Sequence, residues 1–395
     1  MLKTVYFDAH HRHKWQCFRI RLVDKSKIVN YINTHVLTCN KCVLLSMPHG
    51  FGKTTVTYTL AVYYQNKVDT KEIFSKLKIS TIPNFDEYLN KFNVIHIDME
   101  DYIVDGDDGS LYLENFRKKL YEQLKIEYPE AELDLNEAHI CDLFRSVYCS
   151  YGNIVLLMDN WDTILKLYPN NKELEDDYFH LLGYMFKCSQ NSIIFALVYL
   201  TGDFPQKALR QQTLLNNFWQ YRMSGAYPAV DGFGFNENDV KELCEKSHID
   251  FKEIEDYCNI YSFREERHFS PTQILKVIQR APGYQTQALK DHQKIIDKFI
   301  NLDIKGLKYT FKWLVDNGEI RTDFLKVITK YTISSLQDCE DAVFYLIDVG
   351  VLSYDDGAWK LCFSSPQIRV YVSQHLDPNY VLKCKDPFGG FSFYF

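Results

Sequence analysis

The sequence predicts an α/β fold in which helices cover both faces of a parallel sheet, followed by a mostly helical second part. Two observations support this prediction. Short runs rich in Val, Ile and Leu alternate with helical segments over the first two thirds of the chain, and successive helices with one hairpin follow. Alternating strands and helices are typical of parallel sheets, because neighbouring parallel strands need a crossover between them.

Four apolar runs are the predicted strands of this sheet. They are Val43–Met47, Val94–Ile97, Ile154–Met158 and Ile193–Leu200. None alternates between polar and apolar residues, so we expect each strand to be buried on both faces. The predicted helices between the strands are Thr54–Gln65, Leu113–Ile126, Ala138–Tyr148 and Leu174–Cys188.

The second part begins near Asp231 and is predicted to be mostly helical. Ser270, Pro271 and Gln273 indicate a helix start, with Ser as N-cap and Gln closing a capping box. Further elements are helices at Gln287–Leu302, Gly306–Asp316 and Asp338–Asp348, a hairpin of Val351–Tyr354 and Trp359–Phe363, and a helix near Ser365. This order is winged-helix-like. The hairpin and the last helix offer only Lys360 and Arg369 as cations, which favours a structural or regulatory lid over a DNA-binding domain.

Composition narrows the class of protein. Of 395 residues, 46% are hydrophobic and 25% charged, which is typical of globular domains. Lys and Arg number 45 against 52 for Asp and Glu, so a protein that coats nucleic acid is not indicated. No signal peptide or membrane span is apparent. The 11 scattered cysteines favour reduced thiols in an intracellular compartment, cytoplasmic or nuclear.

The most informative segment joins the first strand to the first helix. It ends in Gly52, Lys53 and Thr54, as a P-loop (Walker A) does. In such a loop, backbone N–H groups surround phosphate oxygens, the Lys contacts the β- and γ-phosphates and the Thr hydroxyl binds Mg²⁺. The full motif asks for Gly at position 47, where this chain has Met47. The predicted nucleotide-binding residues are Pro48, His49, Gly50, Phe51, Gly52, Lys53, Thr54 and Thr55.

A second polar position follows the third predicted strand. Asp159 ends the run Ile154–Met158, where P-loop enzymes keep the Walker B carboxylate that holds Mg²⁺. Thr201 ends the fourth strand, where a polar side chain would sense the γ-phosphate. Thr54 and Asp159 are therefore the predicted metal ligands, and ATP or GTP with Mg²⁺ the predicted cofactors.

With these motifs the sequence resembles the AAA-ATPase-like domain family of P-loop proteins. The phrases that carry the resemblance are Leu22–Ser26, Pro48–Thr54, Ile154–Asp162, Leu200–Gly202, Leu215–Asn217, Phe233–Glu237, Tyr257–Phe263, Phe269–Leu275 and Tyr345–Leu352. The resemblance implies a P-loop nucleotide-binding domain over 1–230, a helical, winged-helix-like lid over 231–378 and an aromatic tail over 379–395. Members are often fused to a restriction-type nuclease-like module, which we do not find here.

Several positions depart from the family pattern. The family loop also lacks the first glycine, which accounts for Met47, but its paired arginines are His49 and Gly50 here and a later arginine is Pro205. Asn160 replaces the family glutamate that polarises the attacking water, and an amide cannot take up a proton.

The catalytic candidates are Asn160, Asp162 and Thr201, because Asn160 can still orient a water molecule and Asp162 matches a family carboxylate. The sequence leaves three functions open. The first is a slow ATP-driven switch with a five-stranded sheet and a lid. The second is a nucleotide-binding pseudo-ATPase that acts as a scaffold for a protein partner or for self-association. The third is an interaction module that has lost nucleotide, against which the intact Lys53 and Asp159 argue.

Overall fold

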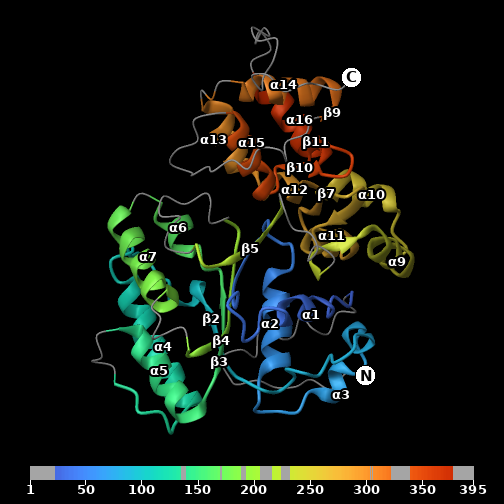
Figure 1. Cartoon of the computed structure of the whole chain (residues 1–395). Coiled ribbons are helices and arrows are strands. Elements are labelled where there is room, and N and C mark those ends of the chain that lie inside the picture. The colour runs from blue at the N-terminus through green and yellow to red at the C-terminus, as the bar shows by residue number, and fades with distance from the viewer. Residues whose placement is uncertain are drawn as a thin grey trace.

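The computed structural model describes residues 23–134, 139–169, 171–187, 193–204, 216–223, 232–302, 304, 306–321 and 339–376. The predicted α/β class is confirmed. A parallel sheet of five strands is flanked by helices, and a mostly helical second part lies beyond one end of the sheet (Figure 1).

The sheet has the strand order β2-β3-β4-β1-β5, and every neighbouring pair is parallel. The strands are β1 (Cys42–Ser46), β2 (Asn93–Asp98), β3 (Ile154–Asp159), β4 (Phe195–Gly202) and β5 (Trp219–Arg222). The four apolar runs therefore form β1 to β4, and the position of the fifth strand, β5, was not predicted. Because β4 lies between β1 and β3, the carboxyl ends of these three strands meet at one edge of the sheet.

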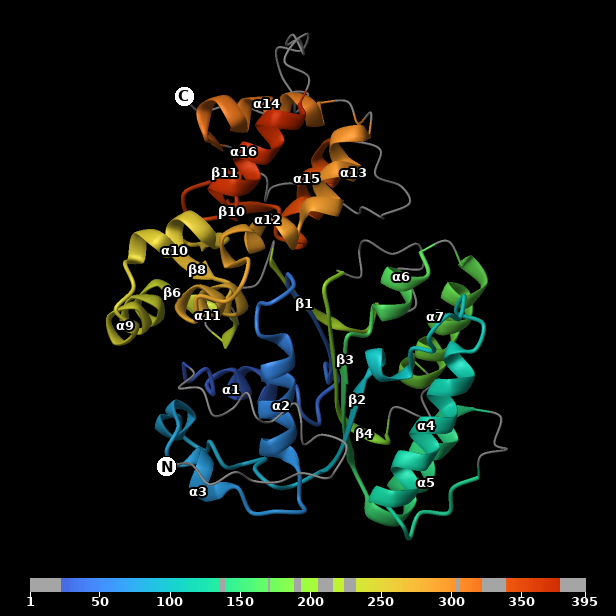
Figure 2. The ribbon, with the colours of Figure 1, turned by 180° about the vertical axis from the view of Figure 1, so that it is seen from behind.

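Helices cover both faces of this sheet (Figures 1 and 2). One face carries α1 (Ile28–Asn33) and α2 (Lys53–Tyr64), and the other α4 (Tyr112–Glu127), α5 (Ile140–Tyr151) and α7 (Lys172–Lys187). Successive strand residues enter opposite cores: Leu45 packs on the α1 and α2 side, and Leu44 on the α4, α5 and α7 side. The short elements are α3 (Lys71–Phe74), the 3-10 helices η2 (Lys78–Thr81) and η3 (Met99–Tyr102), and α6 (Thr163–Leu167).

The second part combines helices with two antiparallel sheets. One sheet contains β6 (Phe235–Asn236), β8 (Glu266–Phe269) and β7 (Ile260–Phe263), and the other β10 (Leu352–Asp355), β11 (Lys360–Phe363) and β9 (Glu319–Arg321). The helices are α9 (Glu237–Ser247), α10 (Phe251–Tyr257), α11 (Pro271–Ile278), α12 (Gln287–Lys290), α13 (Gln293–Asn301), α14 (Leu307–Asn317), α15 (Cys339–Asp348) and α16 (Pro366–His375). Among the described helices, none has the length and apolar character that crossing a membrane requires.

One segment was predicted as a single helix and is two helices in the structure. The segment Gln287–Leu302 forms two helices, α12 and α13, that meet at His292. The His292 side chain is buried, with its Nε2 atom 2.8 Å from Asn259 Nδ2. A contact with a residue distant in the sequence thus interrupts a pattern that is locally compatible with one helix.

Lys360 and Arg369, the two cations considered for DNA contact, both bind groups within the second part of the chain. The Arg369 guanidinium donates to the Val315 carbonyl, at 2.9 Å from Nε and 2.6 Å from Nη2. Lys360 forms an ion pair with Glu319 of the neighbouring strand. Both side chains therefore link the hairpin and α16 to the α14–β9 segment.

Candidate functional site

The loop between β1 and α2 combines two glycines in the left-handed conformation with the start of a helix. Gly50 and Gly52 adopt φ values of +76° and +89°, in the left-handed region that favours glycine. Lys53 and Thr54 open α2, so their N–H groups have no partner within the helix. A helix N-terminus of this kind attracts anions, because the free N–H groups and the helix dipole both favour negative charge.

The loop also packs against the second part of the chain. The Gly50 carbonyl accepts a hydrogen bond from the Ser270 hydroxyl at 3.1 Å and from the Thr272 N–H at 3.3 Å. The predicted capping box at Ser270 is wrong, because this hydroxyl donates to the loop and the Gln273 side chain accepts the Asn259 N–H instead. The first turn of α11 is therefore connected directly to the loop.

The remaining loop residues divide between core and surface. Phe51 is buried and packs edge-on against Tyr261, with 5.4 Å between ring centroids. Pro48 is buried, whereas the side chains of His49 and Thr55 are exposed. Of the predicted nucleotide-binding residues, Phe51 thus fixes the loop to the second part through its side chain.

Asp159 lies at the carboxyl end of β3 and is fully buried. Its Oδ1 atom accepts hydrogen bonds from the Thr201 hydroxyl and from the Asn160 N–H, the latter at 3.0 Å. Its Oδ2 atom is buried and has no hydrogen-bond partner among the described residues. Burial raises the pKa of Asp159, while the Thr201 hydroxyl, the nearby Thr54 hydroxyl and the charge of Lys53 lower it in part. Asp159 Oδ2 is thus the oxygen at which a further donor or a cation could bind.

Thr201 contacts Asp159 because β4 lies between β1 and β3. The sequence suggested that Thr201 senses the γ-phosphate from the end of its strand. In the structure its hydroxyl holds the Asp159 carboxylate in place. The residue is therefore at the expected edge of the sheet, with a contact that the sequence did not indicate.

Asn160 combines an unusual backbone conformation with one side-chain contact. It has a φ of +53°, which Asn tolerates better than most residues. Its Nδ2 atom donates to Asp98 Oδ1 at 3.1 Å. Asp98 ends β2 and is paired in register with Asp159 on β3. Sequence analysis missed Asp98, although it directly follows the second apolar run, as Asp159 follows the third.

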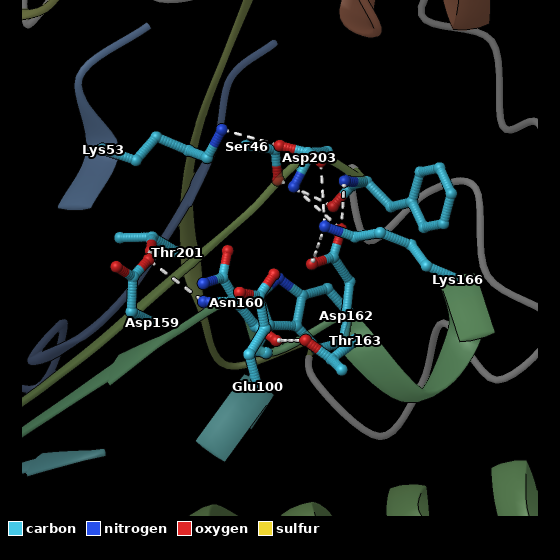
Figure 3. A network of polar contacts seen from close by, with 12 residues as sticks. Ser46, Lys53, Glu100, Asp159, Asn160, Asp162, Thr163, Lys166, Thr201 and Asp203 are labelled. Atoms are coloured by element: carbon cyan, nitrogen blue, oxygen red, sulfur yellow. Dashed lines mark hydrogen bonds and ion pairs between the residues drawn. The ribbon is translucent and has the colours of Figure 1, made fainter. Parts of the chain in front are cut away.

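Asp162 lies in a separate network (Figure 3). Its Oδ2 atom accepts the N–H groups of Asp203 and Phe204 at 2.8 and 2.9 Å, and its Oδ1 atom is 3.0 Å from Lys166 Nζ. The side chain is fully buried, and burial raises its pKa while the Lys166 charge lowers it. These contacts connect Asp162 to the loop after β4, and the catalytic role predicted for it stays a prediction.

Lys53 connects this network to the loop between β1 and α2. Its Nζ atom donates to the carbonyls of Met47 and Pro48 at 2.8 and 3.0 Å, and to Asp203 Oδ1 at 2.7 Å. Lys166 binds the other oxygen of the same carboxylate at 2.8 Å (Figure 3). Sequence analysis missed Asp203 and Lys166, and no local motif marks either residue. Pro205, at the position of a lost family arginine, lies outside the described residues.

Comparison with known proteins confirms the resemblance stated from the sequence. Residues 19–205 match the model of the AAA-ATPase-like family, described as "Predicted AAA-ATPase". The matched residues include the loop between β1 and α2, Asp159 and Asp203. No curated protein matches the sequence.

Several solved structures are similar to this chain at low sequence identity. The Walker-type ATPase PABY2304 of Pyrococcus abyssi shares 12% identity, with 88% of this chain and 94% of that chain covered and a TM-score of 0.44. The ORC2 protein of Aeropyrum pernix, in ADPNP and ADP complexes, shares 10% identity, with 91% and 97% covered and a TM-score of 0.40. A DNA replication initiation factor shares 10% identity, with 78% and 72% covered and a TM-score of 0.32.

Proposed function

We propose that this protein is a Mg²⁺-dependent ATP- or GTP-binding switch that hydrolyses its nucleotide slowly. One observation carries the proposal: the loop that ends in Lys53 and Thr54 lies at the same sheet edge as a buried Asp159 carboxylate with an unpartnered oxygen. The match to AAA-ATPase-like proteins over residues 19–205 supports it.

The residues present fit a bound Mg²⁺ ion. Thr54 and Asp159 would hold it, since a buried carboxylate oxygen without a partner is stabilised by a cation. The described residues contain no cluster of three or more His, Cys, Asp or Glu side chains that could coordinate a metal ion by themselves. The usual Mg²⁺ site of nucleotide-binding proteins has one or two protein side chains, and water and phosphate oxygens complete the coordination. A bound ion would neutralise charge on the phosphates.

Slow hydrolysis follows from the groups around the expected position of the attacking water. Asn160 can orient water through its amide but cannot accept its proton. Asp162 is buried in contacts with backbone N–H groups and with Lys166, which leaves no evident route to a water molecule. The alternative function is a pseudo-ATPase scaffold, which shares the nucleotide site and lacks turnover.

Substitution of Asp159 tests the proposed site. In wild type, nucleotide with Mg²⁺ is expected to raise the melting temperature, because a ligand that binds only the folded state stabilises it. We expect Mg²⁺ to increase nucleotide affinity by at least about tenfold in wild type. The Asp159→Ala and Asp159→Asn variants are expected to keep the metal-free affinity and lose this increase, as measured by calorimetry.

The two variants separate metal binding from structure. Asn at position 159 retains an oxygen that can accept the bonds from Thr201 and the Asn160 N–H, whereas Ala does not. Equal loss of affinity with and without Mg²⁺ in both variants would make Asp159 structural. A wild-type protein that nucleotide does not stabilise would favour the interaction module. A phosphate-release assay then separates a slow switch from a pseudo-ATPase.

Nucleotide is also expected to alter the position of the second part. The Gly50 carbonyl accepts two hydrogen bonds from the start of α11, so a change in loop conformation must move α11 or break these bonds. Closure of domains over nucleotide is a common response of this type. Small-angle scattering should therefore differ between nucleotide-free and ATP-bound protein. Identical scattering curves would support a rigid scaffold, and Ser270→Ala is expected to reduce the difference.

A further inference from the structure

Two lysine ammonium groups meet on one carboxylate at the edge of the phosphate-binding loop. Lys53 Nζ lies 2.7 Å from Asp203 Oδ1, and Lys166 Nζ lies 2.8 Å from Asp203 Oδ2 (Figure 3). Lys53 belongs to α2, Lys166 to α6, and Asp203 directly follows β4. A terminal phosphate can be bound in the same way, with different oxygens shared between two cations.

Lys53 has no spare hydrogen-bond donor in this arrangement. An ammonium group has three N–H bonds, and those of Lys53 are directed to the Met47 carbonyl, the Pro48 carbonyl and Asp203. A phosphate oxygen can therefore bind Lys53 only by displacing one of these acceptors. The two carbonyls belong to the backbone of the loop itself. Asp203 is a side chain that is 21% exposed, so it is the acceptor that can move away.

Asp203 is held in place as an anion. Burial alone would raise its pKa, but the charges of Lys53 and Lys166 hold the pKa of this carboxyl well below its usual range. Its backbone N–H donates to Asp162, and Asp162 also pairs with Lys166. When the Asp203 side chain leaves, Lys166 thus keeps one carboxylate partner and its ammonium stays near the loop.

We propose that the Asp203 carboxylate occupies the place of the nucleotide's terminal phosphate, and that Lys166 becomes a second ligand of that phosphate once Asp203 is displaced. This inference rests on the proposed nucleotide site. It gives the chain a cation near the phosphates where His49 and Gly50 replace two family arginines. It also makes the site selective for the triphosphate, because a diphosphate has no group to take the place of Asp203.

The test compares ATP and ADP affinities of variants by calorimetry in the presence of Mg²⁺. Asp203→Asn is expected to bind ATP about tenfold more tightly than wild type, because the competing anion is gone. Lys166→Gln is expected to bind ATP about tenfold more weakly, with ADP affinity unchanged. Lys71→Gln is the matched control, since Lys71 also pairs with an aspartate but is 62% exposed and remote from the loop.

Each outcome decides the inference. Unchanged or weaker ATP binding by Asp203→Asn would overturn it, as would a loss of ADP affinity in Lys166→Gln equal to the loss for ATP. Nucleotide-free melting temperatures identify a variant that fails to fold, and Lys166→Arg, which keeps the charge, should then retain the preference for ATP. If neither wild type nor Asp203→Asn binds any nucleotide, the proposed function fails together with the inference. If wild type binds ATP and the variants do not alter the ATP-to-ADP ratio, the inference alone fails.

Discussion

Lys53→Ala is expected to lower nucleotide affinity about 10- to 100-fold. Hydrogen bonds to charged groups contribute about 1.5–3 kcal/mol, and every 1.4 kcal/mol is tenfold in affinity. Lys53 is the cation that the loop places at the start of α2, and its side chain is 6% exposed, so water compensates little for its loss. Calorimetry with ATP and Mg²⁺ measures the effect directly.

The same substitution should also reduce stability without nucleotide. It leaves Asp203 with Lys166 as its remaining ion-pair partner, and a half-buried carboxylate that loses a partner destabilises the fold by about 1–2 kcal/mol. The double variant Lys53→Ala with Asp203→Asn should recover part of this stability, while its ATP affinity should remain below that of Asp203→Asn alone. Equal ATP affinity in wild type and Lys53→Ala would show that the loop does not bind phosphate.

Much of the α/β part of the chain could be predicted because its signals are local. The apolar runs of β1 to β4 are continuous, and the glycines and Lys53 occur within one short segment. The strand β5 has no such signal, because Trp219–Arg222 is only four residues long and mixes aromatic with polar side chains. Its place beside β1 is determined by the rest of the sheet.

The part of the site that was missed depends on contacts between distant residues. Asp203 follows a strand, Lys166 lies on a short helix, and neither belongs to a motif. Their meeting with Lys53 depends on the strand order, which places β4 next to β1. The role of Ser270 was missed for a similar reason, since a local N-cap pattern cannot show that the hydroxyl donates to the Gly50 carbonyl. Tertiary contacts override local preference at both places.

The second large effect concerns Asn160, where the family glutamate is missing. A general base contributes about 10²–10⁴-fold, so wild-type turnover is expected to be slow, on the order of one event per minute or less. Restoring the base with Asn160→Glu should raise kcat at least about tenfold at saturating nucleotide, with little change in affinity. Phosphate release under single- and multiple-turnover conditions measures this.

The structure indicates a better form of this experiment. The Asn160 amide donates to Asp98, so a glutamate at this position would place two carboxylates together and make the new base harder to ionise. The φ of +53° at position 160 also disfavours Glu relative to Asn. The exchange Asp98→Asn with Asn160→Glu keeps one amide and one carboxylate in contact. We therefore expect the double variant to hydrolyse faster than Asn160→Glu alone.

The outcomes distinguish the two functions proposed for the chain. Asp98→Asn alone is the control, because it changes the partner of residue 160 without adding a base. If wild type already turns over at ordinary rates and neither Asn160→Glu nor the exchange alters kcat, a missing base is not the limiting feature. If no variant hydrolyses ATP although all bind it, the deficiency lies in the positive charge around the phosphates. His49 and Gly50 replace two family arginines there, and Lys53 is paired with Asp203. That result would make the protein a nucleotide-binding scaffold.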